Sequence, residues 1–110
     1  MLTVRPRYNH WFPSKVGAGA ITLYPYVFFA MSRADAAKEH VITHELQHVR
    51  QVRQRGWLWF YLDYVLQMAI GLYKFKSWNK AYMAISWEVE AYALQEAINP
   101  TESELKEFGF

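Results

Sequence analysis

The 110-residue sequence contains no cysteine and carries a net charge of only +2, from 12 Lys and Arg against 10 Asp and Glu. The absence of cysteine excludes a disulfide-bonded scaffold and a cysteine-ligated zinc site, so histidine and carboxylate side chains are the strong metal ligands that remain. The positive charge is small and dispersed, and no nucleic-acid-binding motif accompanies it. The composition therefore does not indicate a nucleic-acid partner.

The N-terminal residues lack the continuous apolar core of a secretory signal, so a chain that begins here is expected to stay in the cytoplasm. Residues 1–19 contain prolines and glycines without sustained periodicity and are predicted to form a loop. His10 stands alone among aromatic residues there and is expected to be packed or exposed, not to bind a metal.

Apolar side chains are abundant: 53% of the residues are hydrophobic, and 18% are aromatic. Aromatic side chains give a small domain much buried area from few residues, so a chain of this length can form one core. We therefore predict a single domain over residues 1–110.

A His-Glu-x-x-His motif occupies residues 44–48, inside a stretch predicted to form one helix over residues 34–55. Two histidines four residues apart project from adjacent turns of one helical face, so both imidazoles can reach one metal ion. Glu45 then stays close to a water bound to that ion. This pattern is typical of zinc hydrolases.

Both ends of this helix have recognisable signals. Ser32 is followed three residues later by a carboxylate and can start the helix, and Gly56 can end it. Three arginines near the end, Arg50, Arg53 and Arg55, are predicted to complement the helix dipole rather than to bind phosphate. The apolar positions that recur at helical spacing are Val41, Ile42, Leu46, Val49 and Val52. Because these residues supply the core-facing stripe, the histidines are not needed for packing and are available to bind a metal. The alternative to a metal site is that the histidines are merely packed or surface residues beside an incidental glutamate.

Residues 20–30 are rich in β-branched and aromatic side chains and are divided by Pro25. Proline cannot donate to a central ladder, so this region is either a tight hairpin or one edge strand with a bulge. An edge strand can simply cover the core, or it can align an extended peptide by strand addition.

Residues 57–74 form the most apolar run of the chain, interrupted by Asp63 and Gln67. The run is at the short limit for a membrane span. Asp63 and Gln67 share one helical face, so we predict a core helix that is buried nearly all round except for one polar stripe. Membrane contact is the alternative.

A third helix is predicted over residues 78–98, either continuous or restarting at Ser86, and Asn99-Pro100 ends it. Glu88 and Glu90 lie in this otherwise apolar segment. They point about 200° apart on a helix, so at most one of them is expected to reach a metal bound by the histidines. The alternative is that one of them pairs with an arginine of the first helix.

The motif at residues 44–48, followed by Glu-Val-Glu-Ala at residues 88–91, resembles the gluzincin clan of zinc metallopeptidases. The short chain resembles the minimal single-domain members called minigluzincins, over residues 20–98. The resemblance implies a zincin-like α+β fold, mainly α, with zinc bound by His44, His48 and Glu88.

The resemblance also implies an aspartate four residues after the glutamate ligand, where it would support a motif histidine. Tyr92 stands there in this sequence, so that support is expected from Glu90 or Asp63. His40 continues the histidine spacing, but it is two turns, or about 12 Å, from His48 along a helix, which is too far for one ion to join all three histidines.

The function expected from these residues is zinc-dependent peptide hydrolysis, with Glu45 as general base and a peptide or protein as substrate. The alternatives are an inactive zincin-like metal-binding or interaction module, and a small membrane-associated helical protein with an accidental motif. Residues 99–110 form a tail that either packs as a last helical turn or occupies the cleft and keeps the enzyme latent.

Overall fold

The computed structural model describes residues 3–15, 18–38, 40–95 and 99–110. Its elements in chain order are β1 (Arg5–Arg7), α1 (Phe12–Lys15), β2 (Ala20–Leu23), β3 (Tyr26–Phe29), α2 (Arg33–Lys38), α3 (Val41–Arg55), α4 (Trp57–Phe75), α5 (Trp78–Ala84), α6 (Ser86–Leu94) and α7 (Glu102–Glu107). The described part is mainly helical with one small sheet, which agrees with the predicted α+β, mainly α class.

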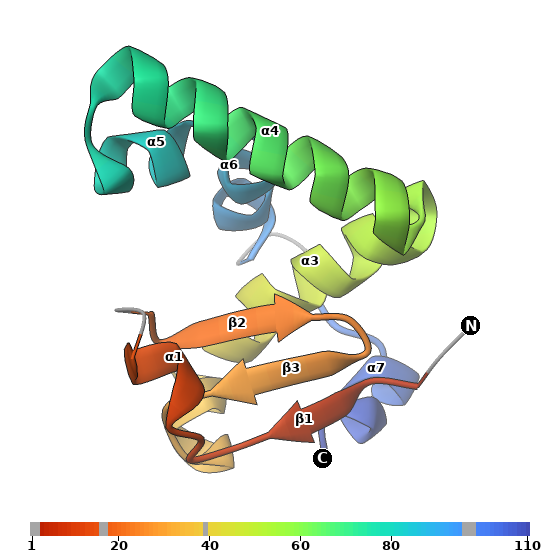
Figure 1. Ribbon diagram of the computed structural model, residues 1–110. Coiled ribbons are helices and arrows are strands. Elements are labelled where there is room, and N and C mark those ends of the chain that lie inside the picture. The colour runs from red at the N-terminus through yellow and green to blue at the C-terminus, as the bar shows by residue number, and fades with distance from the viewer. Residues whose placement is uncertain (1–2, 16–17, 39, 96–98) are drawn as a thin grey trace.

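The sheet has the strand order β1-β3-β2, with β1 parallel to β3 and β2 antiparallel to it (Figure 1). Of the two alternatives for residues 20–30, the tight hairpin is correct, and Tyr24 and Pro25 form its turn. The prediction that residues 1–19 are only loop is wrong. A strand of three residues shows no periodicity of its own, and β1 forms because β3, about twenty residues later, supplies its partner.

The core lies between one face of the sheet and the helices α2, α3 and α7. Side chains of β3 alternate, so Val27 and Phe29 point into this core. The buried residues of the cluster are Val4, Val27, Phe29, Ala36, Ile42, Leu46, Val49 and Phe108. The predicted apolar stripe of the motif helix is thus confirmed at Ile42, Leu46 and Val49. Because this stripe packs on the core, the opposite face of α3 points toward the cleft.

The single helix predicted over residues 34–55 is wrong, because the chain forms α2 and α3 with a break between them. His40 adopts a left-handed conformation at φ 59° directly before α3. Glycine or asparagine usually marks such a turn, and neither is present. The predicted ends are correct: the Ser32 hydroxyl accepts from the Asp35 amide at 3.2 Å, and Gly56 ends α3 at φ 89°.

The prediction that residues 57–74 form a core helix is also wrong. Of the residues of α4, only Phe60 and Gly71 are buried. Asp63 and Gln67 do lie side by side, joined at 2.8 Å, but they face α6, where Trp87 donates to Asp63 at 2.8 Å. The polar stripe is therefore inside and an apolar face is outside. Within the described ranges, none of the helices has the length and apolar character needed to cross a membrane.

The segment predicted as a helix over residues 78–98 is divided between α5 and α6 at Ile85. This corresponds to the restart at Ser86 that the sequence left open. Ser77 caps α5 by accepting from the Lys80 amide. Residues 96–98, the predicted end of the helix, lie outside the described part of the chain.

The C-terminal tail packs on the core and does not enter the cleft. Thr101 and Glu104 form a reciprocal capping box that starts α7. Phe108, which follows the helix, is fully buried against Phe29 with a ring-centroid distance of 6.2 Å. Residues 99–110 therefore do not occupy the cleft of their own chain; of the two alternatives for the tail, packing on the core is correct.

Phe108→Ala is expected to lower the free energy of unfolding by about 3–5 kcal/mol, because it removes a buried ring from a close-packed cluster. Urea unfolding at neutral pH measures this loss. Phe110→Ala is the matched control, since Phe110 is 46% exposed and its truncation should cost much less. Equal small losses from both variants would contradict the structural role of Phe108.

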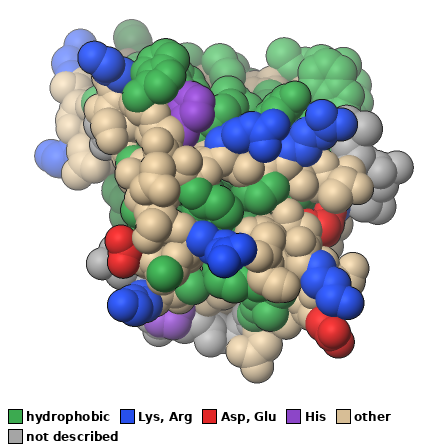
Figure 2. Space-filling model, turned by 90° about the horizontal axis from the view of Figure 1, so that it is seen from below, with side chains coloured by type: hydrophobic (Ala, Val, Ile, Leu, Met, Phe, Trp, Pro, Cys, Tyr) green, Lys and Arg blue, Asp and Glu red, His purple; other side chains and the backbone are tan. Residues whose placement is uncertain are grey.

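Two of the three arginines near the end of α3 bind α7 instead of serving only the helix dipole. Arg50 donates to both carboxylate oxygens of Glu104 at 2.8 and 2.6 Å, and Arg53 donates to Glu107 at 3.2 and 2.6 Å. These forked pairs tie the C-terminal helix to the motif helix. Elsewhere the Lys and Arg side chains form several separate groups on the face seen in Figure 2, not one continuous stripe.

The pairing makes the stability of the protein sensitive to acid. Hydrogen bonds from Arg50 lower the pKa of Glu104 to about 2, and Arg53 similarly lowers the pKa of Glu107. A lowered folded-state pKa means that the stabilisation is complete above the ordinary value near 4.5 and is lost as the pH falls toward 2.

We expect Glu104→Gln to lose about 1–2 kcal/mol of unfolding free energy at pH 7 and to differ little from the unsubstituted chain near pH 2. Urea unfolding across this pH range measures the difference. Glu102→Gln is the control, because the Glu102 side chain is 87% exposed. A difference between Glu104→Gln and the unsubstituted chain that stays constant with pH would contradict this role.

Candidate metal centre

The motif residues lie in a cleft between the edge strand β2 and the helices α4 and α5, with α3 and α6 contributing the remaining walls. The cleft has a volume of about 880 Å³. None of the residues of α7 lines it. Because β2 is an edge strand of the sheet, its backbone lines the same cleft as the motif helix α3.

His44, Glu45 and His48 are all buried at this cleft, and their nearest ligand atoms lie within 4.8 Å of one another. The spacing of four residues on α3 brings the two imidazoles together, with ring centroids 4.9 Å apart. These three side chains form a group that could hold a metal ion. The sequence-predicted motif residues are therefore brought together as expected.

Glu88 comes to the same point from the first turn of α6. Its Oε1 lies 3.1 Å from Nε2 of His44 and 3.1 Å from Nε2 of His48. The Glu88 side chain is only 4% exposed. Of the two glutamates in this segment, Glu88 is thus the one that faces the histidines, and Glu90 lies on another side of α6, as the angle between them requires.

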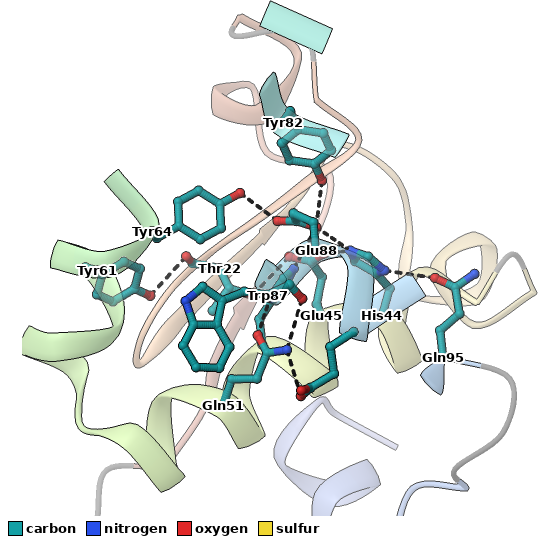
Figure 3. Close-up of polar contacts among 12 residues, drawn as sticks. Thr22, His44, Glu45, Gln51, Tyr61, Tyr64, Tyr82, Trp87, Glu88 and Gln95 are labelled. Carbon is teal, nitrogen blue, oxygen red and sulfur yellow. Dashed lines mark hydrogen bonds and ion pairs between the residues drawn. The ribbon is translucent and has the colours of Figure 1, made fainter. Parts of the chain in front are cut away.

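Both imidazoles are oriented by glutamines through their other nitrogen. Nδ1 of His44 lies 2.8 Å from Oε1 of Gln95, and Nδ1 of His48 lies 2.9 Å from Oε1 of Gln51. Gln51 is itself held, because its Nε2 donates to the Trp87 carbonyl at 3.0 Å and to Glu90 at 3.1 Å (Figure 3). A glutamine oxygen accepts a hydrogen bond from the Nδ1–H group of each ring, which leaves the lone pair on Nε2.

This donor set fits a divalent ion such as zinc. With Nδ1 engaged, the lone pair of each imidazole faces the same carboxylate oxygen at 3.1 Å, and a cation, either a proton or a metal, stabilises such an arrangement. A tetrahedral zinc site with bonds near 2.0–2.1 Å separates neighbouring ligand atoms by about 3.3 Å, close to the observed spacing. The two histidines and one carboxylate match the composition of catalytic zinc sites.

The charges of the site favour the presence of a cation. Burial alone lowers the pKa of His48, but the hydrogen bond to Glu88 and the charge of Glu45 outweigh it and raise the pKa to about 9. Burial alone raises the pKa of Glu88, but hydrogen bonds with both histidines outweigh it and hold this pKa well below its ordinary value. The site thus stabilises positive charge at the point where the three atoms meet.

Two tyrosines hold the carboxylate of Glu88. The Tyr64 hydroxyl donates to Oε2 at 2.6 Å, and the Tyr82 hydroxyl donates to Oε1 at 2.9 Å (Figure 3). Burial, followed by the charge of Glu88, raises the pKa of both phenols, so they stay protonated and remain donors. Helices α4 and α5 therefore position a side chain that belongs to α6.

Glu45 lies beside the histidines but is held differently. Its Oε2 is 3.9 Å from Nε2 of His44, and its Oε1 accepts from the Thr22 hydroxyl of β2 at 3.0 Å. Burial raises its pKa above the ordinary value. The carboxylate thus lies next to the ligand group with a hydrogen bond that fixes one of its oxygens.

The support predicted for the histidines is only partly correct. Glu90 acts through Gln51 and not directly, and Asp63 binds Gln67 and Trp87 instead. Tyr92 packs against the ring of His44 with centroids 4.3 Å apart. The residues that the sequence analysis missed are Gln51, Gln95, Tyr64 and Tyr82. Only Gln51 had a local signal, because it follows His48 by three residues on the same helical face.

Neither of the other two histidines joins the group. His10 accepts from the Phe12 amide at 3.1 Å and stacks against Trp11, so it is packed, as expected. His40 is exposed at the break before α3 and lines the outer part of the cleft.

Comparison with known proteins finds a family model that matches part of the chain. A model of the family described as the eCIS core domain matches residues 10–56, a segment that covers the β2–β3 hairpin and α2 and includes all three motif residues. No curated protein and no solved structure matches the chain. The matched segment ends at Gly56, and Glu88 lies outside it.

Proposed function

We propose that this protein is a zinc-dependent metallopeptidase in which His44, His48 and Glu88 hold the ion. The observation that carries the proposal is the convergence of two oriented imidazole Nε2 atoms and one carboxylate oxygen at 3.1 Å, with a second buried carboxylate beside them. Three protein ligands and a neighbouring glutamate are typical of catalytic rather than structural zinc. Zinc bound there would polarise a carbonyl and lower the pKa of a water.

Glu45 is the residue that moves protons in this proposal. Its carboxylate accepts a proton from the attacking water and then donates it to the nitrogen of the leaving amine, so no net proton is consumed. The hydrogen bond from Thr22 orients one oxygen and leaves the other toward the ligand group. Burial keeps the carboxylate away from bulk water and strengthens it as a base.

The edge strand β2 supports a peptide as the substrate. An extended peptide can pair with an unpaired strand edge and lie across the cleft. The Tyr61 hydroxyl donates to the Thr22 carbonyl at 3.1 Å and accepts from the Tyr24 amide at 2.8 Å, so it covers the end of this edge. A peptide added to β2 would therefore pair with residues before Thr22.

Zinc analysis combined with a peptide-library digest tests the proposal. The purified full chain should contain about one zinc per molecule by elemental analysis, and mass spectrometry should detect cleaved peptides. A chelator should stop cleavage, and added zinc should restore it. A chain without bound metal would contradict the whole proposal, and a zinc-loaded chain that cleaves nothing would instead be a metal-binding module.

A further inference from the structure

The outward face of α4 is completely apolar. Eight exposed residues form this face: Leu58, Trp59, Leu62, Val65, Leu66, Ala69, Ile70 and Tyr73. The seven large side chains among them are 49–84% exposed. At 100° per residue, all eight fall within an arc of about 140°, and that arc contains no charged residue. Because the face runs from Leu58 to Tyr73 along α4, it extends for about 24 Å at a rise of about 1.5 Å per residue.

In the described part of the chain, this face of α4 is left exposed. The other side of α4 makes the packing contacts: Phe60 is buried, and Gly71 lies so close to α5 that a side chain there would meet Ala81 at 2.9 Å. Asp63 and Gln67 also point inward, toward α6. Folded proteins seldom expose an apolar surface of this extent unless it binds a partner or a membrane.

The charges around the face indicate the kind of partner. Between residues 54 and 86 there are four cations, Arg55, Lys74, Lys76 and Lys80, and all four are exposed. Asp63 is the one acidic residue in this range, and it is bound by Trp87 and Gln67. The apolar face is therefore bordered by positive charge at both ends, which complements an anionic surface.

Aromatic residues stand at the same two ends. Trp57 and Trp59 lie in the first turn of α4, Tyr73 lies in its last turn, and Trp78 begins α5; all four are at least 63% exposed. Trp and Tyr favour the boundary between lipid tails and headgroups, because their rings are apolar and their N–H and O–H groups are polar. Apolar residues flanked by aromatic residues and lysines are typical of helices that lie in a membrane interface.

We propose that the apolar face of α4 binds the surface of a bilayer that contains anionic lipids, with the helix lying in the plane of the membrane. A second copy of the chain fits less well, because pairing two such faces brings the same cations together. Figure 1 shows α4 along one end of the molecule, where a flat surface can reach it without contacting the sheet. Val65 and Ala69 belong both to this face and to the cleft lining, so the cleft opens next to the membrane.

Co-sedimentation with vesicles tests this proposal on the full chain. Phosphatidylcholine vesicles that contain phosphatidylglycerol should bind the protein and shift its tryptophan emission to shorter wavelength, whereas phosphatidylcholine alone should bind it weakly. The double substitution Leu62→Glu and Leu66→Glu should remove binding. Each change of Lys74, Lys76 or Lys80 to glutamine should weaken binding about fivefold.

Trp11→Glu is the matched control, since Trp11 is 66% exposed but belongs to the sheet side of the molecule, and it should bind as the unsubstituted chain does. Circular dichroism checks that each variant is folded. Equal binding to neutral and anionic vesicles, or full binding by the double variant, would overturn the proposal. A concentration-dependent dimer that the double variant abolishes, without vesicle binding, would overturn it in favour of a second copy.

Discussion

Glu45→Gln is expected to reduce peptide hydrolysis by about three orders of magnitude or more while the fold and the zinc content stay unchanged. Glutamine has the same shape and can still accept the Thr22 hydrogen bond, but it cannot take a proton from water at neutral pH. Because Glu45 is not required to hold the ion in the proposed site, its charge is lost without loss of a ligand. The initial rate of peptide cleavage and the zinc content of the same sample measure the two effects.

Glu102→Gln is the control for the loss of a carboxylate as such, because Glu102 lies on α7 and is 87% exposed. It should cleave peptides at the rate of the unsubstituted chain. Loss of zinc from Glu45→Gln would show that Glu45 is a ligand. Retention of most activity would show that another group acts as the base.

The motif helix could be predicted because its information is local. The spacing of His44 and His48 sets their shared face on α3, and the apolar residues Ile42, Leu46 and Val49 define the opposite, buried face. The end of the helix was also predictable, because Gly56 has no side chain that would clash at the positive φ found there. Glu88 and Glu90 are both candidates from the sequence, and only the resemblance to the gluzincins favours Glu88; its distance from the histidines depends on how α6 packs.

The parts that could not be predicted depend on contacts between distant segments. Gln95 reaches His44 across 51 residues, and Tyr64 and Tyr82 reach Glu88 from two other helices. Glutamine and tyrosine are common on any surface, so the sequence alone does not distinguish these positions. The left-handed turn at His40 carries no glycine or asparagine, so the sequence gives no local signal for it either.

Helix α4 shows a different limit of sequence patterns. Asp63 and Gln67 mark one face, and the pattern alone suggested that this face meets water. In the structure these residues satisfy the Trp87 ring nitrogen and the Ser86 amide, so the polar stripe belongs to a helix contact. A hydrophobic pattern shows which residues differ from their neighbours, but the partner of each face depends on where the other helices pack.

Glu88→Ala is expected to weaken zinc binding by more than about 100-fold, because it removes a charged ligand, an effect larger than that of losing a supporting residue. The same change leaves the donors of Tyr64 and Tyr82 without their acceptor, so the fold must be checked separately. Competition with a chromophoric chelator measures zinc affinity. The rise in melting temperature on adding zinc gives a second readout, because an ion that binds only the folded state stabilises it.

Glu90→Ala and His40→Ala are the matched comparisons for this ligand assignment. Glu90 contacts Gln51 and not a histidine, so its loss should weaken zinc binding by about tenfold at most. His40 lies outside the ligand group, and its loss should leave zinc affinity unchanged. If Glu90→Ala abolished zinc binding and Glu88→Ala did not, the third ligand would be Glu90. The packing of α6 against α3 would then have to turn by about half a helical turn in the zinc-loaded protein.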